Sequence, residues 1–363
     1  MALQVGIIGL PNSGKTTIFN ALTRAGAQVA GYPFSTVDPN YGVAAVPDAR
    51  LEKVAKAAKC GKVVPADLRL VDIAGLVEGA HRGEGLGNQF LAHIREVDAI
   101  AHAVRCFSSP DVAHVRAEVD PVKDIEVVNA ELILADLEAV SRRKERIGKA
   151  AASGDREKAR EMEVLRKVEE GLDSETPVRA MGLSRDEKAV LDGLFLLTAK
   201  PVIYVANLGE DQLPDGGPLL EAVREVAEAE GARTVAFCAR LEAEIEELEA
   251  DEMEEFLAAY GIERPGLEEF ASRCCDLLGL ITFFTTESGE CRAWPLRSGG
   301  SAVEAAGKIH TDMARGFIRA EVIGWEDFLA YGSFSAAREA GAVRVEGRDY
   351  VVRDGDVMLF RFS

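Results

Sequence analysis

The hydrophobic residues of the first hundred positions fall into short runs that alternate with helical segments. Apolar runs occupy residues 3–10, 68–76 and 99–107, and a helical segment from Thr16 to Thr23 follows the first of them. Strands that alternate with helices are typical of a mostly parallel sheet that is covered on both faces. Two later apolar runs, PVIYVANL and RTVAFCA, predict two further strands of that sheet. The predicted fold class is therefore α/β.

A different pattern interrupts these strands, because the region from about Val128 to Leu172 is charged and spaces its apolar residues by three and four. The turn signal Ser153-Gly154-Asp155 divides it, which predicts an antiparallel helical hairpin. Residues 141–170 contain ten Lys or Arg and seven Asp or Glu, so the hairpin is locally positive. This charge indicates a binding surface for RNA or protein, or equally the solvated face of a coiled coil.

The pattern changes again from roughly Leu278. The segments LITFFTT and CRAWPL flank residues 287–290, a helix is predicted at Ala302 to His310, and VRVEG, RDYVV and VMLFRF close the chain. Short apolar runs separated by turn residues are typical of strands. We therefore expect a small β-rich domain with one or two helices.

Length and charge narrow the class of protein. A chain of 363 residues with 47% hydrophobic residues can fill two or three domain cores. Its formal net charge of −19 argues against a protein that coats nucleic acid or anionic membrane with its whole surface. No apolar run approaches the roughly 20 residues that span a bilayer, and the N-terminus lacks the pattern of a signal peptide, so we expect a cytoplasmic protein. The six cysteines are scattered and predict small core residues, not a zinc site or disulfides.

A phosphate-binding motif follows the first apolar run directly. Residues Gly9 to Thr16 read GLPNSGKT, which fits the pattern of Gly, four residues, Gly, Lys and Ser or Thr. Glycines let successive backbone N–H groups curl around phosphates, Lys15 would neutralise the β and γ oxygens, and Thr16 would bind Mg²⁺. The strand–loop–helix context is the one that this motif requires.

Two further segments suit a bound triphosphate. Asp72 follows a buried strand and opens an Asp-x-x-Gly motif, in which the carboxylate can hold the Mg²⁺ shell and Gly75 can donate its N–H to the γ-phosphate. Thr36 stands where a switch threonine would close on Mg²⁺, although a simple turn residue explains it too. The joint order of the three elements predicts a GTPase-type site.

The residue that orients the attacking water is left open by the sequence. Leu76 follows Gly75 and cannot act as a glutamine would. Three histidines are near in sequence, namely His81, His102 and His114, and each could equally be structural. A bound potassium ion or a partner could also supply the missing group.

The base-reading motif departs from that of a GTPase. Guanine is read by Asn-Lys-x-Asp, whereas the corresponding strand end here carries Asn207-Leu208-Gly209-Glu210. An adenine edge does not present the two donors that a guanine-reading Asp accepts, so the change makes ATP plausible. Cys238 lies in the loop that normally touches the base.

Taken together, GLPNSGKT, YPFSTVDPN, DIAGLVEGA, EGLGNQFL and the NLGE variant resemble the YchF family of Obg-like ATPases over essentially the entire chain. The resemblance implies a Ras-like G domain at residues 1–278, interrupted at 128–180 by a helical coiled-coil hairpin. It implies a TGS domain of the β-grasp type at 279–363. It also implies Mg²⁺-dependent ATP hydrolysis and association with the ribosome or its large subunit.

Carried over by position, the resemblance assigns roles to individual residues. It implies phosphate binding by residues 12–17 (Asn12, Ser13, Gly14, Lys15, Thr16 and Thr17) and Mg²⁺ binding by Thr16 and Thr36, with Asp72 beside them. Leu208, Asn207 and Glu210 would line the base pocket, and His114 is favoured over His81 for orienting water. Cys238-Ala239-Arg240 replaces the more usual Ser-Ala-Lys, which bears on nucleotide choice.

The sequence thus predicts a slow ATPase switch, monomeric and without membrane contact, whose hairpin and TGS domain dock on a ribosomal surface. The alternatives are a true GTPase of the Obg class and a nucleotide-sensing scaffold with negligible hydrolysis. Leu76 keeps the scaffold open.

Overall fold

The computed structural model describes residues 3–24, 39–73, 86–108 and 118–363. Contacts between Cα atoms divide the chain into two compact units. The first unit comprises Met1–Val43 and Arg69–Phe270, and the second comprises Ala44–Leu68 and Ala271–Ser363. The predicted boundary at residues 278 and 279 stays a prediction, and each unit is described by itself.

The first unit is built on a six-stranded sheet with the order β2-β4-β1-β5-β6-β7. Its strands are β1 (Gln4–Ile8), β2 (Asn40–Val46), β4 (Ala66–Asp72), β5 (Ala99–Arg105), β6 (Val202–Asn207) and β7 (Arg233–Phe237). β1 pairs in parallel with β4 and β5, β5 with β6, and β6 with β7. The predicted parallel sheet is therefore confirmed, and β2 is an additional strand that the hydrophobic pattern did not indicate.

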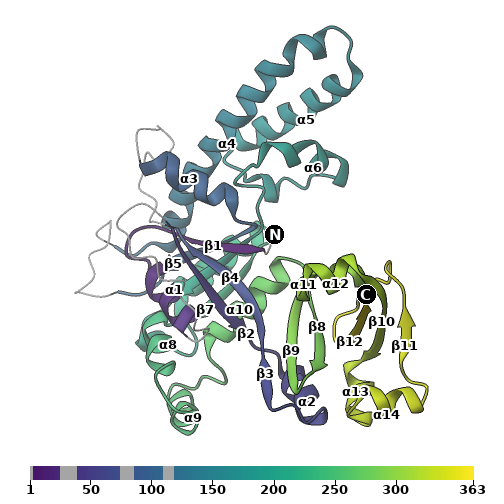
Figure 1. Cartoon of the computed structure of the whole chain (residues 1–363). Coiled ribbons are helices and arrows are strands. Elements are labelled where there is room, and N and C mark those ends of the chain that lie inside the picture. The colour runs from purple at the N-terminus through teal and green to yellow at the C-terminus, as the bar shows by residue number, and fades with distance from the viewer. Residues whose placement is uncertain (1–2, 25–38, 74–85, 109–117) are drawn as a thin grey trace. The chain divides into compact units, whose positions relative to one another are not determined.

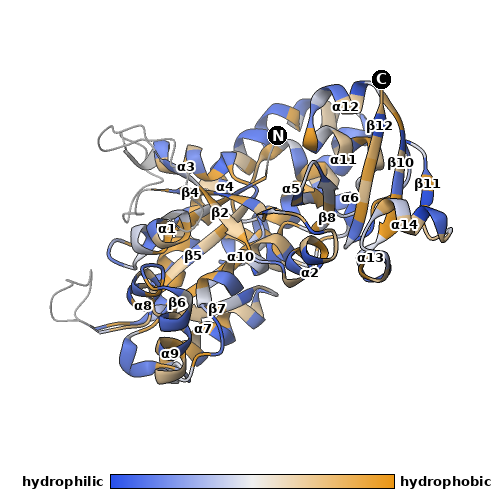
Figure 2. Cartoon of the chain, turned by 60° about the horizontal axis from the view of Figure 1, so that its bottom comes forward, coloured by the Kyte–Doolittle hydropathy of each residue, from blue (hydrophilic) through white to orange (hydrophobic). Residues whose placement is uncertain are grey.

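Helices surround this sheet (Figure 1). They are α1 (Lys15–Arg24), α3 (Leu86–Glu96), α7 (Gly217–Ala229), α8 (Ala239–Ile245), α9 (Ala250–Ala259) and α10 (Gly266–Leu277). Every residue of β5 is buried, as expected for a central parallel strand with both faces covered. Figure 2 shows the matching pattern, with orange along the strands and blue on the outer turns of the helices.

The helical hairpin consists of α4 (Pro121–Ala152) and α5 (Arg156–Asp173), which lie side by side (Figure 1). Asp120 caps α4 by accepting a hydrogen bond from the N–H of Lys123, and Asp155 caps α5 in the same way. Val140, Ile147, Leu165 and other apolar residues fill the seam between the two helices. The hairpin is as predicted, except that α4 begins at Pro121, earlier than the charged pattern suggested, because the Asp-Pro pair starts the helix.

One helix serves two hydrophobic cores. The first turns of α4 place Ile125, Val128 and Leu132 in the core beside the sheet. Farther along, Val140 and Ile147 belong to the separate core of the hairpin. The hairpin core also includes residues of the segment that follows α5, which contains η2 (Val178–Ala180), α6 (Arg185–Leu191) and η3 (Asp192–Leu194).

A buried polar network fixes the root of the hairpin. The Arg179 guanidinium lies 2.7 Å from the Glu230 carboxylate and donates to the side-chain oxygen of Asn129 on α4 at 2.9 Å. The hydroxyl of Tyr204 on β6 donates to the same carboxylate at 2.8 Å. Removing one partner from such a pair typically costs about 3–5 kcal/mol, because the remaining charge is buried alone.

The second unit contains another six-stranded sheet, with the order β11-β10-β12-β8-β9-β3. Its strands are β3 (Lys62–Val64), β8 (Leu280–Glu287), β9 (Glu290–Arg297), β10 (Phe317–Gly324), β11 (Arg344–Glu346) and β12 (Asp356–Phe362). β8 and β9 form an antiparallel pair, β12 pairs in parallel with β8, and β10 pairs antiparallel with β12. A parallel central pair flanked by antiparallel neighbours is the arrangement expected of the β-grasp domain that the resemblance implied.

The helices of this unit are α2 (Ala49–Ala57), α11 (Ala302–Ile309), α12 (Thr311–Arg315), α13 (Trp325–Tyr331) and α14 (Phe334–Glu339). The predicted helix at 302–310 is present, but the expectation of one or two helices was wrong, because three short helices follow it. The expected strand RDYVV was also wrong. Only Val351 forms a bridge there, to Ser301, because the segment is a turn region between β11 and β12.

Candidate functional site

The phosphate-loop motif occupies the connection between β1 and α1. β1 ends at Ile8 and α1 begins at Lys15, as the motif predicted. The register of the sheet pairs Ile7 with Asp72 on β4 and with Ala101 on β5. Because parallel strands end at the same edge, the loop and the carboxyl end of β4 meet there, which is where open α/β sheets bind ligands.

The loop backbone has the left-handed conformations that an anion-binding curl requires. Asn12 has φ +63°, and Gly14 has φ +95°. A Cβ atom added to Gly14 would lie only 2.2 Å from the side-chain nitrogen of Asn207, and one added to Gly9 would lie 2.4 Å from the carbonyl oxygen of Ala103. Both glycines are therefore required by space as well as by conformation. Successive N–H groups in such a curl form a concave site for phosphate.

Lys15 is a buried cation at the centre of this loop. Only 7% of the residue is exposed, and its Nζ donates to the carbonyl oxygen of Leu10 at 2.9 Å. Burial lowers the pKa of Lys15 to about 8, and the nearby charge of Asp72 offsets part of that effect. The ammonium group is thus held in place before any ligand arrives, and an anion beside it would favour its charged form.

Two oxygen groups meet next to the lysine. The hydroxyl of Thr16 donates to Oδ2 of Asp72 at 3.1 Å. Burial raises the pKa of Asp72, while the Thr16 hydrogen bond and the charge of Lys15 oppose that shift. A buried carboxylate beside a hydroxyl is a donor set that suits Mg²⁺, which usually takes one or two protein oxygens and completes its shell with water and phosphate.

Asn207 links the phosphate loop to the base end of the site. Its side-chain nitrogen donates to the carbonyl oxygen of Ser13 at 3.0 Å, and its side-chain oxygen accepts from the N–H of Ala239 at 3.0 Å. Both functions of the amide are thus used to hold the loop against the start of α8. The sequence placed Asn207 among the base-lining residues, and the structure adds this bracing contact.

A cavity of about 1010 Å³ runs from the phosphate loop past the end of β6 to α8. All the predicted nucleotide-binding residues line it except Ser13, which is buried in the loop beneath. The lining residues from that prediction are Asn12, Gly14, Lys15, Thr16, Thr17, Asn207, Leu208, Glu210 and Cys238. The cavity is large enough for a nucleotide.

Several lining residues were missed by the sequence analysis. Phe107 follows the end of β5 and presents an aromatic wall, and the guanidinium of Arg105 lies 4.5 Å from its ring centroid. Arg240 on α8 lies 3.4 Å from the carboxylate of Glu210 and 3.4 Å from that of Glu244. The only available signal for Phe107 was its place just past a strand end, at the binding edge of the sheet.

The histidine candidates separate clearly. His102 lies in β5 with 2% of the residue exposed, and its ring centroid is 5.4 Å from that of Tyr204. Burial lowers the pKa of His102 to about 3, with the charges of Arg179 and Lys15 adding to the effect. His102 is thus a neutral interior residue. His81 and His114 lie outside the described residues, as do Thr36, Gly75 and Leu76.

A glycine-bearing loop between the central strand and its helix, a buried lysine, a Thr–Asp pair and a base-sized cavity define a P-loop nucleoside triphosphatase of the GTPase superfamily. Within the described ranges, no helix is long and apolar enough to cross a membrane.

Comparison with known proteins agrees with this class and narrows it. The family model of a 50S ribosome-binding GTPase matches residues 4–144, and the YchF-GTPase_C model, described as a protein of unknown function, matches residues 280–363. The chain is 49% identical over 365 residues to the ribosome-binding ATPase YchF of Bacillus subtilis strain 168, and 48% identical over 363 residues to that of Escherichia coli O157:H7. Both alignments cover 100% of each chain.

A solved structure extends the match to the fold. The YchF GTPase of Schizosaccharomyces pombe superimposes with a TM-score of 0.87 at 34% identity, covering 99% of this chain and 97% of that one. The chain therefore belongs to the YchF family. The family, the Ras-like α/β fold and the nucleoside triphosphatase class that the sequence predicted are confirmed.

Proposed function

We propose that the chain is a slow Mg²⁺-dependent ATPase whose nucleotide state controls its binding to the ribosome. It acts as a cytoplasmic monomer in this proposal. The relatives at 48–49% identity are named ribosome-binding ATPases, which supports both halves of the proposal. The intact phosphate loop supplies the site for the triphosphate.

The preference for ATP rests on the base end of the cavity. Glu210 stands where a GTPase has its guanine-reading aspartate, and its carboxylate lies 3.4 Å from Arg240. A guanine would have to compete with that guanidinium for the acceptor, so the two-donor recognition of guanine is weakened. Leu208 adds a buried apolar residue in the position of the lysine.

Residues of the phosphate end divide the remaining work. Thr16 and Asp72 would hold Mg²⁺, with Thr36 joining them when triphosphate is bound. The metal would neutralise charge that develops on the phosphates, and Lys15 and the loop amides would do the same from the protein side. Gly75 would donate its N–H to the γ-phosphate and His114 would orient the water. A potassium ion is the alternative aid to hydrolysis.

A second candidate, a true GTPase, is favoured by the printed description of the S. pombe structure. Calorimetric titration of ATP and GTP in the presence of Mg²⁺ separates the two. We expect ATP to bind more tightly. GTP binding at least about tenfold more tightly, a difference of about 1.4 kcal/mol, would overturn the proposal.

Phosphate release then separates an enzyme from a nucleotide-sensing scaffold. We expect Lys15→Ala to abolish multiple-turnover release with and without ribosomes, and His114→Ala to slow it while leaving ATP affinity nearly intact. Release that Lys15→Ala does not change would leave only the scaffold. Equal turnover in the His114 variant would return the role to His81, potassium or a partner.

A further inference from the structure

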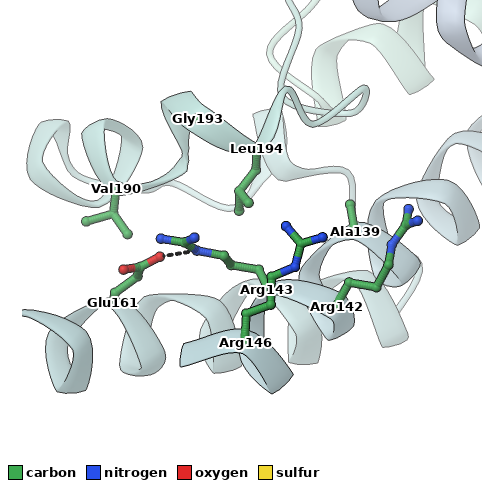
Figure 3. A pocket seen from close by; sticks show the side chains of 8 residues that line it. All are labelled: Ala139, Arg142, Arg143, Arg146, Glu161, Val190, Gly193 and Leu194. Atoms are coloured by element: carbon green, nitrogen blue, oxygen red, sulfur yellow. Dashed lines mark hydrogen bonds and ion pairs between the residues drawn. The ribbon is translucent and has the colours of Figure 1, made fainter. Parts of the chain in front are cut away.

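The hairpin contains a second hollow that the nucleotide site does not use. It measures about 360 Å³ and lies between α4, α5 and the α6–η3 segment. Figure 3 shows the side chains that line it, and Val190 and Leu194 face the arginines from across the hollow. The lining residues are Ala139, Arg142, Arg143, Arg146, Glu161, Val190, Gly193 and Leu194. We call this hollow the arginine pocket.

Helix geometry explains why three arginines meet here. Residues 139, 142, 143 and 146 of α4 are spaced as i, i+3, i+4 and i+7, which places them on one face of the helix. Lys144 belongs to the same basic tract in the sequence but falls on a different face, where it pairs with Glu169 on α5. The tract is therefore not a uniform block of charge.

The positive charge of the pocket is only partly compensated. Arg143 donates to Glu161 at 2.6 Å, and Lys158 donates to the other oxygen of that carboxylate at 2.8 Å, so Glu161 is shared by two cations. Arg142 is 57% exposed and lies 3.6 Å from Glu138, a contact too exposed to hold it firmly. Arg146 is exposed and makes no hydrogen bond or ion pair with any residue that the structure describes.

A neighbouring hollow of about 550 Å³ continues the basic lining. It shares Arg143, Glu161 and Val190 with the arginine pocket and adds Lys158 and Arg160. An extended anion with charges at regular spacing could therefore contact both hollows. A single small anion would use only one of them.

An exposed aromatic residue stands at the edge of the pocket wall. Phe195 directly follows Leu194, is 66% exposed, and has φ +51°, in the left-handed region that a phenylalanine rarely adopts. Residues held in such conformations gather at functional sites. An exposed aromatic ring beside arginines is the combination that binds a base by stacking and its phosphate by charge.

We propose that the arginine pocket binds the phosphate backbone of a single-stranded RNA segment, with Phe195 as the stacking surface for a base. This deepens the proposed function, since it names RNA as the ribosomal component that the hairpin contacts. Guanidinium groups match phosphate oxygens in a two-pronged geometry. An acidic peptide would satisfy the charges but has no base for Phe195, and the net charge of −19 repels RNA from most of the remaining surface.

The test uses full-length protein and a fluorescein-labelled 12-nucleotide uridine strand, with binding followed by anisotropy at about 50 mM salt. We expect R142Q/R146Q to weaken binding at least about tenfold, because two phosphate contacts are lost. The matched control K149Q/R156Q removes the same charge from exposed hairpin positions outside both hollows and should change affinity less than about twofold. Phe195→Ala should weaken binding at least about fivefold.

Glutamine keeps the helix propensity of arginine, and thermal melting confirms that the variants are folded. Equal losses in the two charge pairs would overturn the pocket, because only net charge would then matter. Displacement of the RNA by 12-residue polyglutamate at an equal or lower concentration would overturn RNA in favour of an acidic protein. Tighter binding of wild type than of R142Q/R146Q, with Phe195→Ala weakened, supports the proposal.

Ribosome co-sedimentation keeps this inference distinct from the proposed function. If wild-type protein does not sediment with ribosomes, the proposed ribosome binding fails, while the oligonucleotide titration still decides the pocket. If wild type and R142Q/R146Q sediment equally, ribosome binding stands and the arginine pocket is not its RNA contact.

Discussion

The phosphate loop and the arginine pocket present positive groups to anions in opposite ways. The loop uses backbone N–H groups and one lysine that is 7% exposed, held by a hydrogen bond to Leu10. The pocket uses flexible guanidinium groups, two of them on exposed residues. A rigid, buried site orders little on binding and is weakly screened by salt, whereas an exposed one tolerates varied ligands and is strongly screened. The comparison suggests one site for a defined nucleotide and one for a variable backbone.

The largest effect should come from adding one methyl group to the loop. In Gly14→Ala the new Cβ would lie 2.2 Å from Asn207, and φ +95° would strain the residue. We expect ATP affinity to fall by about 100-fold, because strain of about 1–3 kcal/mol adds to the displacement of the bracing amide. Calorimetry measures the loss, and RNA binding by the pocket should stay unchanged.

Gly148→Ala is the matched control, since nothing lies within 4 Å of an added Cβ at that hairpin position. It should leave both affinities intact. Normal ATP binding by folded Gly14→Ala protein would show that the loop is less rigid than the comparison requires.

Salt should separate the two sites next. If three arginines contact phosphates, the RNA affinity of wild-type protein should fall by about twentyfold between 50 and 200 mM salt, because each released counterion adds to the dependence. ATP affinity at fixed Mg²⁺ should fall less, since Lys15 is buried. Anisotropy and calorimetry over the same salt series measure both. Parallel losses would remove the proposed difference in screening.

The smaller effect is a dependence on pH that only the nucleotide site should show. Burial lowers the pKa of Lys15 to about 8 in the free protein, and a bound triphosphate favours the charged form. Below pH 8 the lysine is already protonated, so ATP affinity should be flat. Above pH 8 binding must take up a proton, so affinity should fall, by about tenfold between pH 7 and 9.

Arginine does not titrate in this range, so RNA affinity should hold between pH 7 and 9. Titrations of each ligand across that interval give the comparison. A flat ATP profile would mean that Lys15 has an ordinary pKa, and that burial in the loop does not shape its charge.

Local patterns account for the parts of this molecule that the sequence predicted. The spacing from Gly9 to Thr16 fixes a strand–loop–helix unit, and Asp72 follows a buried strand, so both could be placed at one sheet edge without coordinates. The hairpin followed from apolar spacings of three and four. Each of these signals lies within a few neighbouring residues.

The missed features depend on contacts between distant residues. β3 pairs with β9, and the contact from Lys62 to Glu290 spans 228 positions, so residues 44–68 carry no local sign that they pack with the C-terminal strands. The bracing role of Asn207 needs the position of Ser13. The arginine pocket likewise needs the α6–η3 segment opposite α4.

The continuity of α4 has a mechanical consequence. Its 32 residues rise about 48 Å without interruption, and its two ends are packed in different cores. Any rotation imposed on the helix where it leaves the sheet would swing Arg142 and its neighbours through the same angle. The helix can therefore act as a crankshaft, and a protein with one broken turn inserted near Glu138 would lose that linkage while keeping both ends intact.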